Sequence, residues 1–467
     1  MIDVFPFAGL PVAVLGLGKS GLVAARALEA SGADVWAWDD SADKRKTAES
    51  EGIRIVDLRS CDWSQLTTLV ISPGIPHAFP APHPVAAAAK AHNIEIISDI
   101  ELLARTQREA AYIGITGTNG KSTTTALIGH ILREAGRTVA VGGNIGTAAL
   151  SLPALASGGT YVLEMSSYQI EITYSITFDV AVLLNISPDH LDRHGGMEGY
   201  IAAKRRIFHR QTRPRTAVIG VDDEHSAAIW QDLVRADDQY IVPISSASKL
   251  IDGVYAADGG LYDAMGAKPV RVASLADFPT LPGAHNWQNA AAAYAAARAI
   301  GIETDVIVAA LKTYPGLAHR QERVGERDGV LFINDSKATN ADAAAKALGC
   351  YENIYWIAGG RAKEGGIVSL APYFKRIRRA YLIGEAADSF ARTLEGHVPY
   401  ALTRNLKSAV ESAFADAVRD GHAGAVVLLS PACASFDQFR DFEARGDAFR
   451  EFVGALHITR VAAGERS

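Results

Sequence analysis

Residues 114–132, GITGTNGKSTTTALIGHIL, combine glycines, a lysine and hydroxyl side chains in a pattern typical of a phosphate-binding loop that leads into a helix. Gly117 and Gly120 let backbone N–H groups surround an anion, and Lys121 can reach the outer phosphates of a nucleotide. The usual pattern has a glycine where this chain has Ile115, so we interpret the loop as a shortened variant that binds ATP or GTP. The alternative is a glycine-rich turn that caps an ordinary helix. The candidate loop residues are Gly117, Thr118, Asn119, Gly120, Lys121, Ser122 and Thr123.

Polar side chains follow two apolar strands of the same region. Glu164 ends the strand in YVLEMSSYQIE, where a carboxylate can hold nucleotide-bound Mg²⁺ and is otherwise costly to bury. The strand in FDVAVLLNISPDHLDRHGG runs into His190, although a histidine among polar neighbours is more often a surface residue than a ligand. Lys204, in YIAAKRRIF, falls on the apolar side of an expected helix, where a lysine normally extends its ammonium to solvent.

A second glycine-rich turn follows the first expected strand of the chain. Residues 16–21 spell G-x-G-x-x-G, and Asp39 or Asp40 lies at the distance expected of a ribose-binding acid. A nicotinamide-dependent oxidoreductase is one interpretation, a site for a uridine diphosphate is a second, and a tight turn without a ligand is a third. In ISPGIP, Ser72 and Gly74 are candidates to line the same crevice.

Three further polar clusters each follow an expected strand in the C-terminal segment of the chain. They lie in NDSKATN, GGRAKEGG and LLSPACASFDQF. The carboxyl ends of parallel strands meet at one edge of a sheet, which is where ligands bind in such folds. The clusters therefore predict a pocket for a small polar substrate. Their candidate residues are Asp335, Lys337, Thr339, Lys363, Ser430 and Phe436.

The composition limits the class of protein. The 467 residues are too many for one ordinary core, and 48% hydrophobic with 21% charged residues is typical of a soluble globular protein. A net charge of −6 argues against a nucleic-acid binder, and three cysteines without paired spacing fit a reduced compartment. Because the N-terminus lacks a basic secretory start and no apolar run is long enough to span a membrane, we expect a cytoplasmic protein.

Strand and helix patterns alternate in three segments, which we expect to be domains with boundaries at 1–108, 109–313 and 314–467. This alternation predicts an α/β fold with parallel sheets flanked by helices. The last segment contains the expected strands VLFIND, NIYWIAGG, AYLIGE and AVVLLSP. Residues 222–280 contain no motif, so we assign them no role.

Together these motifs resemble the Mur ligase family, in family order over nearly the whole chain. The sequences that carry the resemblance are GITGTNGKSTT, VGGNIG, LEMSSYQIE, NISPDHLDRH, AAKRRIF, HNWQNAAAA, LAHRQE, NDSKATN, GGRAKEGG and LSPACASFDQF. The shortened glycine spacing is similar to the ATP loop of this family. NDSKATN and SPACASFDQF are similar to the members that add D-glutamate, because sister ligases have different sequences there.

The resemblance implies three α/β domains. These are an N-terminal Rossmann-like domain that binds UDP, a central P-loop-type domain with a parallel sheet that binds ATP, and a C-terminal Rossmann-like domain that binds D-glutamate. The implied reaction is ATP-dependent ligation of D-glutamate to UDP-N-acetylmuramoyl-L-alanine through an acyl phosphate, a cytoplasmic step of peptidoglycan precursor synthesis. A monomer with no nucleic-acid partner and no membrane span is expected.

The resemblance also implies two Mg²⁺ ions, with Ser122 and Glu164 at one and His190 and Lys204 at the other. Lys204 is implied to carry a CO₂-derived carbamate, since an ammonium repels a metal. Only the neutral amine reacts with CO₂, so the site must lower the lysine pKa from its ordinary value of about 10.4. The implied catalytic residues are Lys121, Glu164, His190 and Lys204.

Matching the family position by position extends each site. Beside loop residues 117–123, the residues expected to contact ATP are Asn286, Arg320 and Asp335. The residues expected to contact the UDP substrate are Gly18, Lys19, Ser20, Asp39, Asp40, Ser72, Gly74, Asn144 and His190. The residues expected to contact D-glutamate are Lys337, Thr339, Lys363, Ser430 and Phe436.

Three alternative functions have separate supports in the sequence. A folylpolyglutamate synthetase shares the ATP loop and also adds glutamate, but NDSKATN and the N-terminal G-x-G-x-x-G argue against it. A nicotinamide oxidoreductase leaves the ATP loop unexplained. A nucleotide-binding module or switch requires Lys121 but not the polar clusters of the last segment.

Overall fold

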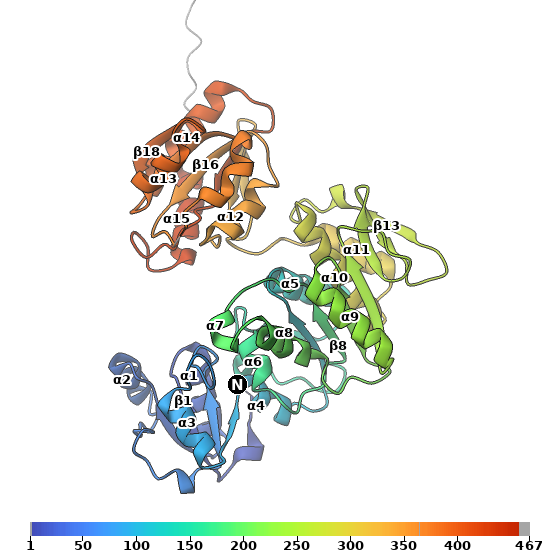
Figure 1. Ribbon diagram of the computed structural model, residues 1–467, viewed down its shortest axis with the longest axis vertical. Coiled ribbons are helices and arrows are strands. Elements are labelled where there is room, and N and C mark those ends of the chain that lie inside the picture. The colour runs from blue at the N-terminus through green and yellow to red at the C-terminus, as the bar shows by residue number, and fades with distance from the viewer. Residues whose placement is uncertain (1, 364, 457–467) are drawn as a thin grey trace, which may run out of the picture. The chain divides into compact units, whose positions relative to one another are not determined.

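The structure, a computed structural model, describes residues 2–363 and 365–456. The described residues form three β-sheets of four, nine and six strands (Figure 1). The chain divides into two compact units, of which the first contains the four- and nine-stranded sheets and the second contains the six-stranded sheet. The first unit comprises Met1–Pro279 and Ala284–Tyr314, and the second comprises Thr280–Gly283 and Pro315–Ser467.

The four-stranded sheet is entirely parallel, in the order β2-β1-β3-β4. Its strands are β1 (Pro11–Leu15), β2 (Asp34–Trp38), β3 (Thr68–Ile71) and β4 (Glu95–Ile97). Helix α1 (Lys19–Ala30) follows β1 after a three-residue turn and buries Ala24, Ala25, Ala27 and Leu28. The other helices of this part are α2 (Ala42–Ser50), α3 (Pro84–Ala91) and α4 (Asp99–Thr106). The G-x-G-x-x-G turn therefore lies at the carboxyl end of a central strand.

The nine-stranded sheet has the order β13-β12-β11-β10-β9-β8-β5-β7-β6. It is parallel from β11 to β6, and its other end is an antiparallel extension that includes β12 and β13. Its strands are β5 (Ala111–Thr116), β6 (Val139–Gly143), β7 (Thr160–Glu164), β8 (Val180–Leu183), β9 (Thr216–Gly220), β10 (Tyr240–Ser245), β11 (Val254–Ala257), β12 (Gly260–Asp263) and β13 (Val270–Ser274). Residues 222–280, which contain no recognisable motif, comprise α9 (Glu224–Ala236), the parallel strands β10 and β11, and the antiparallel strands β12 and β13.

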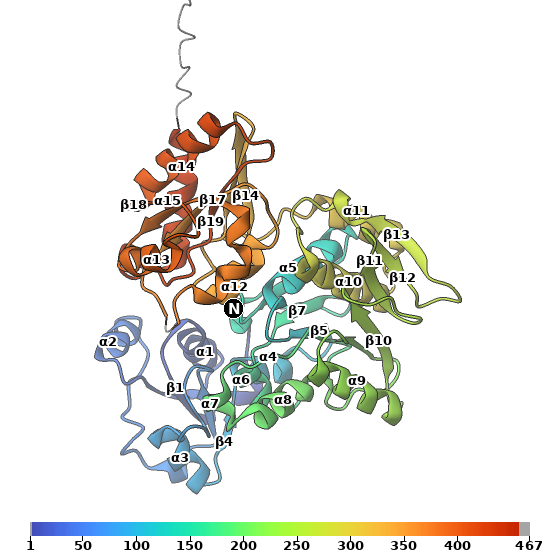
Figure 2. The same cartoon turned by 45° about the horizontal axis from the view of Figure 1, so that its top comes forward.

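Helices α5 (Lys121–Glu134) and α10 (Ala284–Ala299) lie side by side against this sheet (Figures 1 and 2). Helix α10 is rich in alanine, and residues 290–297 on it are completely buried. Small side chains allow this close approach because they occupy little space between a helix and its neighbours. Helix α11 (Thr304–Thr313) packs on α5 and α10. Further helices are α6 (Ser167–Glu171), α7 (Leu191–His194) and α8 (Met197–Arg205).

The six-stranded sheet of the second unit has the order β14-β15-β19-β16-β17-β18, and only β14 is antiparallel. Its strands are β14 (Glu322–Arg327), β15 (Val330–Asn334), β16 (Ile354–Gly359), β17 (Ile377–Ile383), β18 (Tyr400–Arg404) and β19 (Val426–Leu429). The four expected strands are β15, β16, β17 and β19, and the edge strands β14 and β18 were missed. The accompanying helices are α12 (Ala341–Leu348), α13 (Ala387–Leu394), α14 (Leu406–Asp420) and α15 (Phe442–Ala455).

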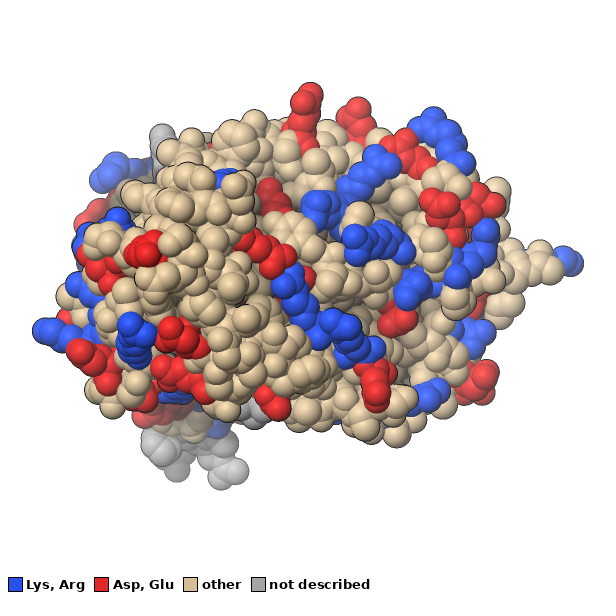
Figure 3. All heavy atoms as spheres, turned by 90° about the horizontal axis from the view of Figure 1, so that it is seen from below, with Lys and Arg blue, Asp and Glu red and all other residues tan. Residues whose placement is uncertain are grey.

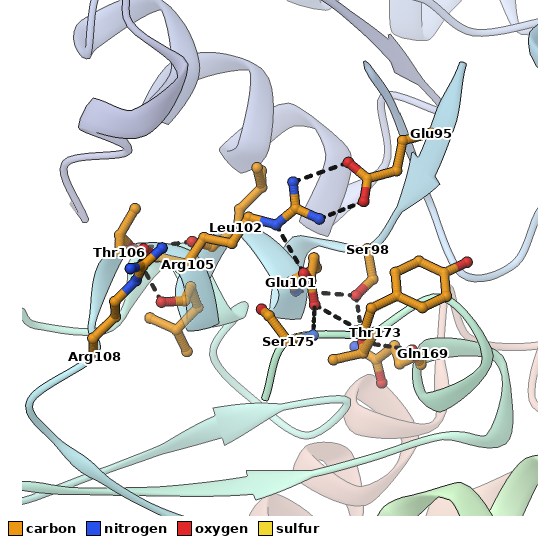
Figure 4. A network of polar contacts seen from close by, with 12 residues as sticks. Glu95, Ser98, Glu101, Leu102, Arg105, Thr106, Arg108, Gln169, Thr173 and Ser175 are labelled. Atoms are coloured by element: carbon orange, nitrogen blue, oxygen red, sulfur yellow. Dashed lines mark hydrogen bonds and ion pairs between the residues drawn. The ribbon is translucent and has the colours of Figure 1, made fainter. Parts of the chain in front are cut away.

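A polar network at α4 joins the two sheets of the first unit (Figure 4). The Glu101 carboxylate is fully buried and accepts hydrogen bonds from the backbone N–H groups of Tyr174 (2.7 Å) and Ser175 (3.0 Å). Its other oxygen accepts a 2.8 Å bond from Arg105. Ser98, at the N-cap of α4, lies 2.8 Å from the Thr173 hydroxyl. Because charged hydrogen bonds in a dry environment are strong, this network holds the segment after α6 against α4.

The surface carries both signs of charge. Acidic and basic side chains are interspersed on the face drawn in Figure 3. Among the helices of the described residues, we find none with the length and apolar character needed to cross a membrane.

Candidate active site

The ATP-loop candidate lies between the end of β5 and the start of α5, and β5 is an interior strand of the nine-stranded sheet, between β8 and β7. Gly120 has a left-handed φ of 85°, and a Cβ there would lie 2.3 Å from Asn289 Oδ1. The Thr118 N–H donates to the Asn185 carbonyl and the Asn119 N–H donates to Asn185 Oδ1, both at 2.9 Å. Asn185, which follows β8, therefore fixes the shape of the loop, and the glycines keep its backbone free of side chains.

Two lysines donate to one carbonyl of this loop. Lys121 Nζ lies 2.9 Å from the carbonyl oxygens of Gly117 and Thr118, and Lys204 Nζ lies 2.9 Å from the same Gly117 oxygen. Lys204 is only 2% exposed, and its ammonium lies 4.6 Å from the centre of the Tyr200 ring. Burial lowers the Lys204 pKa well below its ordinary value, and the Lys121 charge lowers it further. The expectation that Lys204 faces the apolar side of its helix is confirmed.

Glu164 ends β7 and is 2% exposed. Its Oε1 accepts a 2.6 Å hydrogen bond from Asn144 Nδ2, and the Asn144 N–H donates to the Glu164 carbonyl at 2.9 Å. Its Oε2 is buried and has no hydrogen-bond partner among the described residues. A buried carboxylate oxygen without a donor is costly unless a cation binds there, so Glu164 fits a Mg²⁺ ligand. Ser122, in the first turn of α5, is also buried and brings a hydroxyl of the kind that ligates Mg²⁺.

His190 occupies the N-cap of α7 with a left-handed φ of 53°. Its side chain is 53% exposed, and its Nε2 lies 3.5 Å from Asp189 Oδ2. The neighbouring His194 differs, because its ring is buried, with Nδ1 2.8 Å from Glu171 Oε1 and Nε2 2.9 Å from Ser167 Oγ. His194, to which no role was assigned from the sequence, joins α7 to α6, whereas His190 keeps an accessible imidazole.

The first glycine turn is held by direct backbone contacts. Ser72 Oγ donates to the Gly16 carbonyl at 2.9 Å, and a Cβ on Gly21 would lie 1.7 Å from the same oxygen. Gly18 and Gly74 have open space instead, with no atom within 4 Å of an added Cβ. Gly18 is the N-cap of α1, so the space lies at the positive end of a helix, which suits a diphosphate.

The two aspartates after β2 have different partners. Asp39 is buried, and its two oxygens accept bonds from the N–H groups of Leu17 (2.7 Å) and Ser41 (2.9 Å). Asp40 is exposed and lies 2.9 Å from His83 Nε2, a contact that lowers the Asp40 pKa. Asp39 therefore shapes the glycine turn, and Asp40 presents its carboxylate at the surface.

Other expected substrate residues lie around these two turns. Lys19 Nζ donates to the Gly146 carbonyl, which connects α1 to the loop after β6. Asn286 is buried on α10, and its Oδ1 accepts a 3.1 Å bond from Asn289 Nδ2. Ser20 and Thr123 are half-buried in the first turns of α1 and α5.

In the second unit, Asp335 is buried directly after β15. Its Oδ1 accepts a 3.1 Å bond from the Gln321 N–H and its Oδ2 a 2.8 Å bond from Ser430 Oγ. Burial raises the Asp335 pKa to about 7, although these hydrogen bonds oppose the shift. Ser430 is fully buried, so its hydroxyl serves Asp335 in this structure. Arg320, in the segment before β14, is exposed.

The remaining candidates of this unit surround the ends of β15, β16 and β19. Lys337 Nζ lies 3.8 Å from the centre of the Phe442 ring, a cation–π contact that was not expected from the sequence. Thr339 is half-buried on the same loop, and Lys363, after β16, is exposed. Phe436 is 65% exposed, which leaves its ring accessible at the surface.

Comparisons with known proteins agree with this architecture. The model of the Mur ligase middle domain matches residues 115–297, and that of the Mur ligase, glutamate ligase domain matches residues 319–433. A solved UDP-N-acetylmuramate-alanine ligase from Thermotoga maritima aligns over 95% of this chain and 99% of its own, with a TM-score of 0.58 at 16% identity. This likeness supports the expected three-domain α/β fold class, with sheets that are mainly parallel.

Curated relatives match the chain at much higher identity. The UDP-N-acetylmuramoylalanine–D-glutamate ligase of Rhodospirillum rubrum is 57% identical over 99% of this chain and 98% of its own length. The protein of the same name from Caulobacter vibrioides is 55% identical over 98% of both chains. Identity of this extent, together with both domain matches, shows that the chain belongs to the Mur ligase family.

Proposed function

We propose that the chain joins D-glutamate to UDP-N-acetylmuramoyl-L-alanine with consumption of ATP, as a step of peptidoglycan precursor synthesis. The relatives named for this reaction support the substrates. The main structural support for an ATP site is that the side chains of Lys121 and Lys204 both donate to the Gly117 carbonyl. Two lysine side chains beside a glycine loop at a helix N-terminus form a site for a polyphosphate.

In this proposal residues 117–123 hold ATP, and Lys121 turns from the loop carbonyls to the outer phosphates. Asn286, Arg320 and Asp335 complete the ATP contacts. Ser122 and Glu164 hold one Mg²⁺, and His190 and Lys204 hold a second. When bound, Mg²⁺ supplies positive charge that offsets the repulsion between a carboxylate and the γ-phosphate. The orphaned Glu164 oxygen supports this assignment.

Lys204 requires a modification to serve a metal. In the proposed reaction the neutral Nζ attacks the carbon of CO₂, a C–N bond forms, and one proton leaves the nitrogen to give a carbamate anion. Burial and the Lys121 charge lower the Lys204 pKa, which favours the neutral amine that this step needs. The carbamate nitrogen would keep one N–H, while its anionic oxygens could serve as ligands of a cation.

The reaction proceeds in two displacements. The terminal carboxylate of the UDP substrate attacks the γ-phosphorus of ATP, the bond to the β-phosphate oxygen breaks, and ADP leaves. The amine of D-glutamate then attacks the acyl carbon, phosphate leaves, and the nitrogen loses a proton to give the amide. Lys121 stabilises charge on the transferring group, and exclusion of water protects the acyl phosphate from hydrolysis.

Substrate contacts follow from the two sheet edges. We assign the UDP substrate to the first glycine turn and its neighbours, with Asn144 near the muramoyl-alanine part. The full set is Gly18, Lys19, Ser20, Asp39, Asp40, Ser72, Gly74, Asn144 and His190. D-Glutamate has two carboxylates, which lysines and hydroxyls bind well. We assign it to Lys337, Thr339, Lys363, Ser430 and Phe436.

The same proposal includes a division into three domains, a monomeric state and a cytoplasmic location. The proposed domains are residues 1–108, 109–313 and 314–467. The substrates of the reaction are soluble nucleotides and an amino acid, so neither a nucleic acid nor a membrane partner is required. The family-model matches at residues 115–297 and 319–433 fall within the proposed second and third domains, 109–313 and 314–467.

The direct test measures phosphate release from ATP and Mg²⁺ with UDP-N-acetylmuramoyl-L-alanine. D-Glutamate is compared with L-glutamate, L-lysine, meso-diaminopimelate and no amino acid. We expect release that depends on D-glutamate and a product heavier by one glutamyl residue in mass spectrometry. No release with any acceptor, from a folded protein that binds ATP, would refute the proposed substrates.

A further inference from the structure

Arg445 is a buried cation on α15 that lies beneath the strand-end loops of the second unit. Its side chain is part of the core, with an exposed fraction of 1%. Nε donates to Ser336 Oγ at 2.9 Å, and Nη2 donates to the carbonyl oxygens of Ser336 (2.8 Å) and Cys433 (3.1 Å). One guanidinium therefore joins the loop after β15 to the loop after β19.

A third loop borders the same group. The buried Nη1 has no hydrogen-bond acceptor among the described residues. A Cβ added to Gly360, which directly follows β16, would lie 3.3 Å from Nη1 and 2.3 Å from the Ala434 carbonyl oxygen. The loop after β16 therefore passes close to the guanidinium. These are the three loops that carry Lys337, Lys363 and Ser430.

The partners of Arg445 are unusual for a buried charge. It bonds to a hydroxyl and two carbonyls, and within the described part of the chain it bonds to no carboxylate. Burial lowers the Arg445 pKa to about 10, so the group is still charged at neutral pH. A buried cation without a bonded counterion is a poor source of stability, because desolvation opposes its hydrogen bonds. Its geometry, with donors directed at several loops, fits a positioning role better.

The contacts lead directly to the expected glutamate site. Ser336 Oγ, which accepts from Arg445, also donates to the Phe442 carbonyl at 2.8 Å. Lys337 is the next residue after Ser336, and its ammonium lies over the Phe442 ring. A shift of Ser336 therefore moves both the backbone of Lys337 and the ring that orients its side chain.

We propose that Arg445 is a positioning residue that fixes the relative positions of the loops after β15, β16 and β19, so that their side chains can bind D-glutamate. This inference rests on the proposed function, because D-glutamate is the substrate assigned to these loops. Arg445 acts through Ser336, Cys433 and the backbone near Gly360 and does not itself contact the substrate. Loss of the guanidinium therefore affects the second displacement more than the first.

The test compares Arg445→Lys with Arg450→Lys, a matched variant on the same helix. Arg450 forms an ion pair with Glu322 Oε1 through Nε (2.9 Å) and Nη2 (2.6 Å), and the other oxygen of Glu322 accepts a 3.0 Å bond from Asn334 Nδ2 at the end of β15. Unlike Arg445, Arg450 bonds to a carboxylate, and a lysine can keep that ion pair. Lysine keeps the charge but loses the fork that bonds two loops at once. For Arg445→Lys we expect KM for D-glutamate to rise at least about tenfold while KM for ATP and for the UDP substrate changes less than about twofold, because only the glutamate loops lose a bond. Arg450→Lys should leave all three values nearly unchanged.

Ser336→Ala provides a second variant that keeps the guanidinium. It removes the hydroxyl between Arg445 and the Phe442 carbonyl, so we expect a smaller rise in KM for D-glutamate, with KM for ATP unchanged. Thermal unfolding of each variant shows whether the fold is intact at the assay temperature. Should Arg445→Lys not fold, Ser336→Ala alone decides.

The outcomes separate this inference from the proposed function. Equal rises in KM for all three substrates, or no rise for D-glutamate in a folded Arg445→Lys or Ser336→Ala protein, would overturn the positioning role. A wild-type protein that releases phosphate without any dependence on D-glutamate would instead overturn the proposed function. A selective rise for D-glutamate in Arg445→Lys, absent in Arg450→Lys, supports the inference.

Discussion

The two glycine turns of the first unit have the same local design and different surroundings. Residues 16–21 follow β1 and residues 117–120 follow β5, and each turn leads into the N-terminus of a helix. In the first turn a buried aspartate, Asp39, accepts a backbone hydrogen bond from Leu17. In the second turn two lysines donate to one backbone carbonyl. The first turn is thus bonded to a carboxylate and the second to two lysine side chains.

This difference shows why a glycine pattern alone does not identify a ligand. Both turns offer N–H groups at a helix end, which suits any phosphate. Lys121 and Lys204 both bond to the backbone of the second turn, whereas Lys19 of the first turn donates to the Gly146 carbonyl. The second turn also lies beside a buried carboxylate, Glu164, that is suited to a metal. The alternative of a nicotinamide enzyme came from the first turn, where the local pattern is ambiguous.

The largest expected effect tests Lys204, the second lysine bonded to the second turn. Lys204→Met removes the amine and fills the space with an apolar chain of similar length. We expect activity to fall on the order of 10³-fold, as for other lost electrostatic groups, while ATP still binds. Steady-state kinetics and nucleotide titration measure the two effects. Turnover within a few-fold of wild type would show that Lys204 has no part in the reaction.

The same variant has an opposite effect on stability. The folded-state pKa of Lys204 lies below the unfolded value, so the unfolded chain binds more protons between the two values and wild-type stability rises with pH there. In metal-free buffer without CO₂, Lys204→Met should therefore be more stable than wild type at neutral pH, by a margin that shrinks as the pH rises toward the unfolded-state pKa. Urea unfolding at several pH values measures this margin. A margin that grows with pH would contradict the buried neutral amine.

The next prediction concerns the backbone of the first turn. An alanine at Gly21 would bring its Cβ within 1.7 Å of the Gly16 carbonyl oxygen, which cannot move without breaking the bond from Ser72. We expect Gly21→Ala to destabilise the fold by about 3 kcal/mol, as other overpacked sites do. Thermal unfolding measures the loss. Gly120→Ala makes the corresponding change in the second turn. The left-handed φ alone costs roughly 1–2 kcal/mol, the Cβ would also lie 2.3 Å from Asn289 Oδ1, and ATP affinity should fall.

Features that depend on residues close together in the chain were predictable from the sequence, whereas contacts between distant residues were not. The ATP loop and Lys204 were recognisable because spacing and helical phase are local properties. Strand β14 (ERVGER) was missed because it is a charged edge strand with little apolar alternation. The Lys337–Phe442 contact was missed because it joins residues that are far apart in the chain. Sequence patterns place residues at strand ends but do not give their partners across a sheet.

Ser430 illustrates the same limit within the candidate site. Its place after β19 predicted a substrate contact, and the structure directs its hydroxyl to Asp335 after β15. Neighbouring strands β15 and β19 pair in parallel, so their ends meet, but which of the two polar groups faces a ligand depends on burial. Ser430 is fully buried, so its assignment to D-glutamate stays a prediction that depends on the position of the bound substrate.

A smaller effect is expected from the acid of the first turn. Both Asp39 oxygens accept backbone N–H groups, from Leu17 and Ser41, and an asparagine can accept only one of them. Asp39→Asn should therefore destabilise the fold by about 1–3 kcal/mol. The exposed neighbour is the control, because Asp40→Asn loses one surface contact with His83 and should stay within about 0.5 kcal/mol. Equal unfolding midpoints for the two variants would contradict the difference between these aspartates.

The smallest effect on stability separates the two roles of glycine in one turn. Gly18 has no atom within 4 Å of an added Cβ, and its φ of −72° suits any residue. Gly18→Ala should therefore change the free energy of unfolding by less than about 0.5 kcal/mol. The added methyl would occupy space at the start of α1 where the diphosphate is proposed to approach, so KM for the UDP substrate should rise while KM for ATP stays constant. A variant with unchanged KM for both would remove the diphosphate from this turn and leave only its structural role, whereas a selective rise would make Gly18 a binding glycine and Gly21 a packing glycine.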